Sequence, residues 1–287
     1  MICHLCPRNC GVDRAVERGF CGMGEGIRIA RAGLHFWEEP VISGTKGSGA
    51  VFFSGCTLRC AFCQNREISA EGFGKEISTE RLREIFEELV AQGAHNINLV
   101  TPTHFLPWIL PALSPALPVP VVYNCGGYEK PETLRALEGK VQIWLPDLKY
   151  GDDAPALRLS GAGDYFAAAT AAISEMYRQV GPYTVEDGLL KSGVIFRHLV
   201  LPGQPENTRR CIDWVASNFA PGQVLFSLMA QYTPPPGAEG ALARHVTKAE
   251  YRAAAEYMEN CGITDGFTQE RTSAREEYTP PFDLTGV

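Results

Sequence analysis

The chain has 287 residues, of which 45% are hydrophobic and 21% charged, and its formal net charge at pH 7 is -7. This length suits one large α/β domain or two small ones, with enough apolar residues for a sizeable core. The acidic balance and the lack of a long basic run argue against nucleic acid as a partner, because phosphate contacts need clustered Lys and Arg.

Seven of the ten cysteines lie in the first 63 residues, at spacings typical of metal ligands. No cleavable signal precedes Cys3, and the most apolar stretch, 106–123, is interrupted by five prolines, so we expect neither export nor a membrane span. In a reducing compartment such cysteines favour metal ligation over disulfides. We therefore expect a cytoplasmic protein, and we expect it to be a monomer.

Four cysteines open the chain as Cys-x2-Cys-x3-Cys-x10-Cys: Cys3, Cys6, Cys10 and Cys21. Four thiolates complete a tetrahedral zinc site, and an auxiliary 4Fe-4S cluster needs the same number. The spacing does not separate these two, and free thiols are the third possibility. Frequent glycines between residues 11 and 26 indicate loops. We predict a Cys-rich metal-binding lobe over residues 1–48 and a second domain over residues 49–287.

Three further cysteines, Cys56, Cys60 and Cys63, stand as Cys-x3-Cys-x2-Cys directly after the apolar run 50–53. Three thiolates on one short loop ligate three irons of a cubic 4Fe-4S cluster, and the fourth iron stays open for a reactant, as one position stays open in catalytic zinc sites. The pattern therefore predicts a catalytic cluster. A zinc knuckle, with Cys60 and Cys63 as one ligand pair, or unrelated buried thiols are the alternatives.

From Gly49 onward, short β-branched runs alternate with amphipathic helical stretches, which predicts a parallel sheet with right-handed crossovers. The predicted strands are 50–54, 96–101, 119–124, 141–147, 194–201 and 224–230. The clearest helix begins at Ser78 or Thr79 and ends at Gly93. Later helices are predicted at 131–137, 165–179, 206–218 and 248–260, with a proline-interrupted stretch at 105–117. Six such units suit an α/β fold of the open, partial (β/α)6 barrel type.

Active sites of these barrels lie at the carboxyl ends of the strands. Each predicted strand end carries polar or glycine-containing sequence, at 56–63, 101–104, 124–127, 147–149, 197–203 and 231–233. Asp147 and Lys149 are two residues apart, so both point to the same side of an extended strand. They form either part of a binding site or a surface salt bridge. Asn124, followed by Gly126 and Gly127, marks either a ligand contact or an ordinary turn.

The Cys56 to Cys63 loop, with Phe62 directly before its last cysteine, resembles the signature of the radical S-adenosylmethionine (SAM) enzymes. The resemblance implies a 4Fe-4S cluster and SAM as cofactors. It implies that the amino and carboxylate groups of SAM chelate the open iron, and that an electron from the cluster cleaves the sulfonium to a 5′-deoxyadenosyl radical.

Over about residues 1–270, the chain resembles the pyruvate formate-lyase activating enzyme-like branch of this superfamily. The resemblance is carried by Asp147-x-Lys149, by Arg197 with Pro202-Gly203, and by the string Cys6-Pro7-Arg8-Asn9-Cys10. It implies that Lys149, beside Asp147, holds the SAM carboxylate, a role suited to a flexible ammonium. It also implies that Arg197 lies at the bound cofactor as the catalytic side chain. Asn124 is placed to bind the ribose, and Gln231 is a further expected cofactor contact.

The second strand end departs from the activating enzymes, because Thr101-Pro102-Thr103-His104 replaces the Gly-Gly-Glu-Pro type motif that contacts the SAM amino group. The hydroxyls of Thr101 and Thr103 are the candidate replacements. His104 is either a proton donor to substrate or a structural histidine, and we favour the structural role. The eight-cysteine ferredoxin insert of some activating enzymes is also missing.

These features predict an enzyme that reductively cleaves SAM and abstracts hydrogen from a substrate. One candidate substrate is a glycyl radical enzyme, which needs an open barrel mouth. The alternative is a small metabolite, favoured if segment 266–282 covers the mouth; this segment is otherwise a surface tail. A non-catalytic electron carrier is disfavoured because carriers fill all four iron positions with protein ligands. We expect a low-potential electron donor, such as flavodoxin or ferredoxin, as a partner.

Overall fold

The computed structural model describes residues 1–269 and 279–287 and contains a curved mixed sheet with the strand order β10-β9-β8-β6-β5-β4-β2-β1-β3. Six neighbouring strands of this sheet run parallel to one another, and they are the six strands predicted from the sequence. They are β2 (Ser48–Phe53), β4 (Ile97–Val100), β5 (Val121–Cys125), β6 (Ile143–Pro146), β8 (Leu189–Leu199) and β9 (Leu225–Met229). The path does not close on itself, so the fold is the predicted open, partial (β/α)6 barrel.

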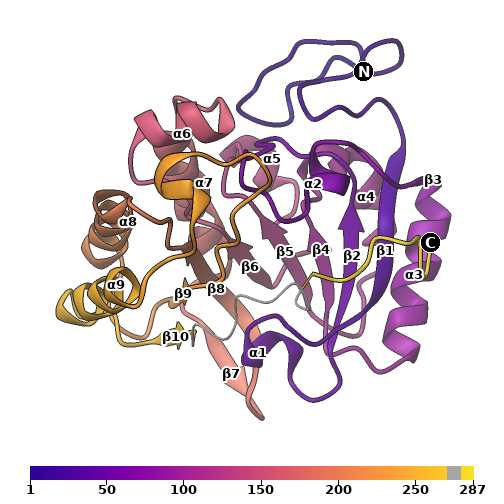
Figure 1. Cartoon of the computed structure of the whole chain (residues 1–287). Helices are drawn as coiled ribbons and strands as arrows, with labels where there is room; N and C mark the ends of the chain where they lie inside the picture. Colours follow the sequence, from indigo (N-terminus) through magenta and orange to yellow (C-terminus); the bar gives the residue numbers. More distant parts are fainter. Residues whose placement is uncertain (270–278) are drawn as a thin grey trace.

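The helices pack around the sheet (Figure 1). α3 (Thr79–Ala91) begins at Ser78, whose side chain accepts a hydrogen bond from Arg81 N, and it buries Leu82, Ile85 and Phe86. The proline-rich stretch forms only a 3-10 turn, Thr103–Phe105, and the short α4 (Leu106–Ala112). The other helices are α1 (Pro40–Ser43), α2 (Arg66–Ser69), α5 (Pro131–Arg135), α6 (Asp153–Ser160), α7 (Tyr165–Val180), α8 (Pro205–Asn218), the 3-10 turn Gly240–Ala243 and α9 (Lys248–Asn260). The five helices predicted from the sequence are present, whereas α1, α2 and α6 were not predicted. None of the described helices is long and apolar enough to cross a membrane.

Four strands were not predicted, and one of them matters for the site. β1 (Ile27–His35) pairs antiparallel with β2, so residues that we expected in the amino-terminal lobe extend the sheet of the barrel. β3 (Lys75–Ile77) pairs with β1, β7 (Thr184–Glu186) pairs with β8, and β10 (Gly266–Thr268) pairs with β9.

The short helix α1 fills the amino-terminal end of the barrel (Figure 1). Ile42 of α1 packs with Val122, Ile143, Leu145 and Ile195, all fully buried. On their strands these residues lie two or four positions before Asn124, Asp147 and Arg197. They therefore face the same side of the sheet as those polar groups. The interior thus has an apolar floor beneath a polar layer.

The described ends of the carboxyl segment lie on opposite sides of the parallel strands. β10 continues the sheet beside β9, whereas Leu284 N donates to Ala30 O of β1 at 3.0 Å. Phe282 packs edge-on against Phe52 of β2, with ring centroids 5.6 Å apart. It joins a buried cluster that contains Val100. Residues 270–278 of the segment expected to cover the mouth lie outside the described residues.

Candidate active site

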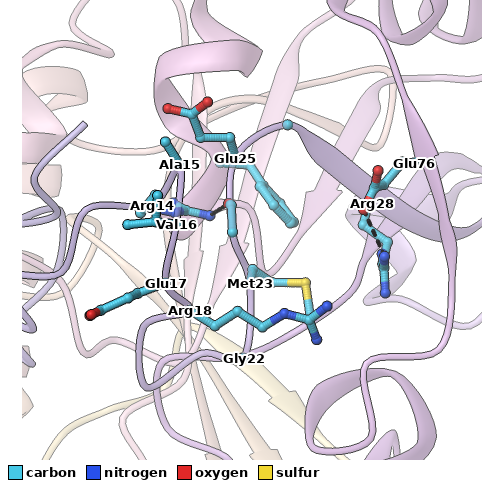
Figure 2. A pocket seen from close by; sticks show the side chains of 13 residues that line it. Arg14, Ala15, Val16, Glu17, Arg18, Gly22, Met23, Glu25, Arg28 and Glu76 are labelled. Atoms are coloured by element: carbon cyan, nitrogen blue, oxygen red, sulfur yellow. Dashed lines mark hydrogen bonds and ion pairs between the residues drawn. The ribbon is translucent and has the colours of Figure 1, made fainter.

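A cavity of about 230 Å³ lies at the carboxyl ends of the parallel strands and is lined from every one of them. Its lining contains Cys56, Cys60 and Cys63 of the loop that follows β2, residues 56–63, which we call the barrel loop or catalytic loop. It also contains Thr101, Asn124, Asp147, Lys149, Arg197 and Gln231. A larger hollow of about 290 Å³ on the amino-terminal lobe, lined by Arg14, Arg18 and Met23, contains none of these groups (Figure 2). The strand-end cavity is therefore the candidate active site.

The three cysteines of the barrel loop line this cavity, and each of their sulfurs accepts a hydrogen bond. Leu58 N donates to Cys56 Sγ at 3.4 Å, Ser160 Oγ to Cys60 Sγ at 3.0 Å, and Ser69 Oγ to Cys63 Sγ at 3.3 Å. Burial and the two neighbouring thiols raise the pKa of Cys56 to about 12, and burial also raises that of Cys63. Without a metal, Cys56 and Cys63 therefore stay protonated and are poor nucleophiles, and a bound metal would have to displace their protons.

The loop fits a cluster better than a single ion. Among the residues that the structure describes, no three or more His, Cys, Asp or Glu side chains are arranged to hold one metal ion. This gives no support to the zinc-knuckle alternative. In a cubic cluster each cysteine binds a different iron, so the sulfurs need not converge on a single point. Three cavity-lining thiols with donors on their sulfurs match that requirement.

A charged network stands opposite the loop. Arg197 Nε donates to Asp147 Oδ1 at 2.8 Å, and Lys149 Nζ donates to Asp147 Oδ2. Burial alone would raise the pKa of Asp147, but the adjacent guanidinium and ammonium groups lower it, so the carboxylate stays ionised. Asp147 in turn raises the pKa of Lys149 against the effect of burial. Both cations therefore remain charged inside the cavity.

Glu38, on the connection between β1 and α1, anchors this network from below and was not predicted. Its Oε1 accepts from Asn98 Nδ2 at 2.9 Å and from Asn124 Nδ2 at 3.2 Å, and its Oε2 accepts from Arg197 at 3.1 Å. Only 9% of the Glu38 side chain is exposed. Arg197 also donates to Asn124 Oδ1. Glu38 thus fixes both the amide and the guanidinium that face the cavity.

The two threonines of the second strand end are placed differently. Thr101 lines the cavity with a left-handed backbone, φ 62°. Thr103 lies outside the lining: its hydroxyl donates to Glu129 at 2.9 Å and accepts from Tyr123 at 3.0 Å. Of the two hydroxyls expected to replace the missing carboxylate, only that of Thr101 borders the cavity.

His104 and Gln231 also have defined surroundings. His104 Nε2 lies 2.7 Å from Ser54 O, and burial lowers the pKa of His104 to about 4. This buried, neutral ring packs on Phe105 with centroids 4.3 Å apart, as expected for a structural histidine. Gln231 lines the cavity. Its main-chain carbonyl oxygen accepts a hydrogen bond from Gln64 Nε2 at 2.8 Å, which connects the end of β9 to the residue after the barrel loop.

The amino-terminal cysteines are all free thiols, and three of them are buried. Burial raises the pKa of Cys6 to about 12, and nearby Cys10 and Cys21 add to the effect. Burial likewise raises the pKa of Cys21, again with contributions from Cys3 and Cys10. Cys6 therefore lies within electrostatic reach of Cys10 and Cys21, and Cys21 lies within reach of Cys3 and Cys10.

Comparison with known proteins agrees with this geometry. The family model of the Radical SAM superfamily matches residues 50–215. A curated relative, "Uncharacterized protein MJ0674" of Methanocaldococcus jannaschii, is 32% identical over 242 residues, which cover 81% of this chain and 66% of the relative, slightly less than two thirds.

Two solved structures share the fold. SuiB of Streptococcus suis bound to S-adenosylmethionine has a TM-score of 0.53 at 15% identity and covers 77% of this chain and 50% of SuiB. HydG, a maturase of the [FeFe]-hydrogenase, has a TM-score of 0.53 at 11% identity and covers 80% of this chain and 54% of HydG. At these identities the likeness concerns the fold alone. With the family model spanning more than half of its length, the chain belongs to the radical SAM superfamily.

Proposed function

We propose that this protein reductively cleaves SAM at a 4Fe-4S cluster held by Cys56, Cys60 and Cys63 and directs the resulting 5′-deoxyadenosyl radical to abstract hydrogen from a substrate. The observation that carries the proposal is that the three thiols share one cavity with the ionised side chains of the strand ends. When bound, the cluster supplies the electron that splits the sulfonium. The remaining steps of binding and orientation fall to the side chains of this chain.

Lys149 is the proposed partner of the SAM carboxylate. It is ionised, lines the cavity and is held by Asp147. Arg197 shares Asp147 and is fixed by Glu38, so its guanidinium is held still beside the bound cofactor. Asn124 uses one amide hydrogen for Glu38 and one lone pair for Arg197. One donor and one acceptor position of this amide remain for ribose hydroxyls.

The substrate class that the fold favours is a small molecule. Phe282 packs into the cluster of Ile68 and Val100, and both of those side chains also line the cavity. β10 lies at the opposite edge of the sheet, where it pairs with β9. The described parts of the carboxyl segment thus flank the open side of the barrel, where a folded protein substrate would have to insert a glycine loop. Activation of a glycyl radical enzyme is the competing proposal.

Anaerobic reconstitution tests the reaction. The wild-type protein should form 5′-deoxyadenosine and methionine from SAM and dithionite, and a variant with Ala at Cys56, Cys60 and Cys63 should not. Cys261→Ala, which changes a cysteine outside the cavity lining, is the matched control. Cleavage by the triple variant at the wild-type rate would refute the assignment of the cluster loop.

The substrate class is then read from isotope transfer. Small-molecule and protein fractions from cells grown in D2O are offered to the enzyme separately. We expect deuterium in 5′-deoxyadenosine only with the small-molecule fraction. Transfer from the protein fraction would favour the glycyl radical alternative instead.

A further inference from the structure

The amino-terminal cysteines are gathered by the backbone of the lobe. Gly11 N donates to Cys3 O at 3.0 Å, which sets Cys3 beside the residue that follows Cys10, and Asn9 N donates to Cys6 O at 3.1 Å in a turn that leads directly into Cys10. A methyl group built on Gly19 would lie 3.5 Å from Cys10 Sγ and 3.7 Å from Cys21 Sγ. Gly19 thus lies beside both Cys10 and Cys21, and backbone hydrogen bonds hold the segments of Cys3 and Cys6 next to that of Cys10.

The lobe is clamped onto the catalytic loop by an arginine from each side. Arg8, between Cys6 and Cys10, donates to Thr57 O at 2.9 Å, inside the barrel loop. Arg59 of the barrel loop donates in the opposite direction, to Phe20 O at 3.3 Å. The Arg8 guanidinium lies 3.8 Å from the centre of the Phe20 ring. Residues between the amino-terminal cysteines therefore contact residues between the barrel-loop cysteines, and the contact runs in both directions.

The two cysteine groups meet at Gly55. A methyl group on Gly55 would lie 2.7 Å from Cys21 O and 2.6 Å from Met23 Cγ, and its φ of 80° favours glycine. Gly55 directly precedes Cys56, so a cysteine of each group borders this contact. Only a residue without a side chain fits here, so the backbones on either side of Cys21 and Cys56 are in close contact.

We propose that Cys3, Cys6, Cys10 and Cys21 hold a second 4Fe-4S cluster that relays electrons to the catalytic cluster. A one-electron, low-potential reductant gives one electron to the amino-terminal centre, which passes it to the catalytic centre. That electron enters the sulfonium of SAM, one carbon–sulfur bond breaks, and methionine and the 5′-deoxyadenosyl radical result, so the electron count closes without a further reactant. The inference rests on the proposed function, because the relay needs an acceptor.

A structural zinc is the main competitor, and the contact of the lobe with the catalytic loop favours a cluster over it. The described residues contain no group of three or more His, Cys, Asp or Glu side chains arranged for one metal ion, and this holds for the lobe as well as for the barrel loop, where the family implies a cluster. Zinc also carries no electrons, so a zinc lobe has no need for close contact with the catalytic loop. The contact at Gly55 and the hydrogen bonds of Arg8 and Arg59 would place a cluster in the lobe directly beside the catalytic loop.

Metal content is the first test. With four irons per cluster, the reconstituted wild-type protein should contain about eight irons and no zinc, and Cys3→Ala/Cys10→Ala should contain about four. The variant that lacks the three barrel-loop cysteines should also keep about four irons, with the electron paramagnetic resonance signal of a reducible cluster. This variant cannot cleave SAM, so its iron content tests the second cluster independently of whether the proposed function is correct. One zinc, or about four irons in the wild type, would overturn the second cluster.

Electron relay is tested without removing a ligand. Arg8→Ala loosens the clamp on the barrel loop and leaves all seven cysteines in place. Arg18→Ala removes an arginine that lines the lobe hollow of Figure 2 and for which the described residues offer no hydrogen-bond or ion-pair partner. With photoreduced deazaflavin as donor, freeze-quench spectra should show the catalytic cluster reduced at least ten-fold more slowly in Arg8→Ala and at the wild-type rate in Arg18→Ala. Equal rates in all three proteins with eight irons each would refute the relay.

Discussion

Replacing Lys149 with Met tests the cofactor site most directly. Met keeps the length and apolar stem of the side chain and removes its charge. In the structure, Lys149 is ionised beside Asp147, and 21% of each side chain is exposed. The proposed SAM carboxylate would bind this ammonium at the edge of the cavity, where water screens the charge only in part.

The size of the effect follows from the bond that is lost. A hydrogen bond to a charged group contributes about 1.5–3 kcal/mol, which corresponds to an affinity loss of about ten- to a hundred-fold. We expect the upper part of this range, because Asp147 loses one of its two cations and its remaining negative charge faces the SAM carboxylate. Arg197 still neutralises Asp147 in part, so binding is weakened and not abolished.

Calorimetric titration of the anaerobic, reconstituted variant with SAM measures this loss. Iron content is determined on the same sample, because Lys149 is not a ligand and the cluster should remain. Lys75→Met, at an exposed position of β3, is the control for removing a lysine elsewhere. An unchanged affinity at full iron content would show that Asp147 and Lys149 are only an ion pair and that the carboxylate is held by another group.

Two further substitutions test side chains that lie outside the lining of the cavity. Glu38→Gln turns an amide donor toward the Arg197 guanidinium, and a buried donor left unpaired costs about 1–3 kcal/mol. We expect the free energy of unfolding in a denaturant titration to fall by this amount and SAM binding to weaken. Glu84→Gln, at an exposed position, should change neither quantity. His198, whose ring nitrogens lie 2.6 Å from Leu148 O and 3.0 Å from Thr208 Oγ1, has its pKa lowered by burial to about 4. The unfolded chain takes up this proton below about pH 6.5 and the folded chain only near pH 4, so stability falls as the pH drops through this window. In His198→Gln the slope of unfolding free energy against pH between 4.5 and 6 should decrease by up to about 1.4 kcal/mol per pH unit; an unchanged slope would mean that the ring takes up its proton alike in both states.

The six parallel strands were predictable because each is a short apolar run that ends in polar or glycine-containing sequence. β1 was not predicted, although the alternation of Ile27 and Ile29 with Arg28 is typical of a strand. Its register against β2 shifts between Ile29 and Arg31, and such an irregularity interrupts the two-residue periodicity on which strand prediction depends. β3, β7 and β10 have three residues each, too few for any periodicity.

The candidate site was predictable where a motif carries it and not elsewhere. The barrel-loop cysteines, Asp147 and Lys149 stand at strand ends and fall in one cavity. Thr103 was expected with Thr101 to replace the motif that is missing at this strand end. The strand has ended there, however: Thr101 takes a left-handed conformation and a 3-10 turn begins at Thr103, and only Thr101 lines the cavity. Glu38 is 86 residues from Asn124 and 159 from Arg197, and only the tertiary fold brings them together.

The position of β1 and α1 bears on what counts as one folding unit. The family model begins at residue 50, yet a chain cut there would lose the strand that pairs with β2, the carboxylate that fixes Arg197 and the isoleucine that fills the barrel floor. The exposed β2 edge would be open to pairing with other chains. The segment that identifies the superfamily is therefore smaller than the segment that must fold together. Truncation at the family boundary would yield an aggregation-prone fragment and not a minimal enzyme.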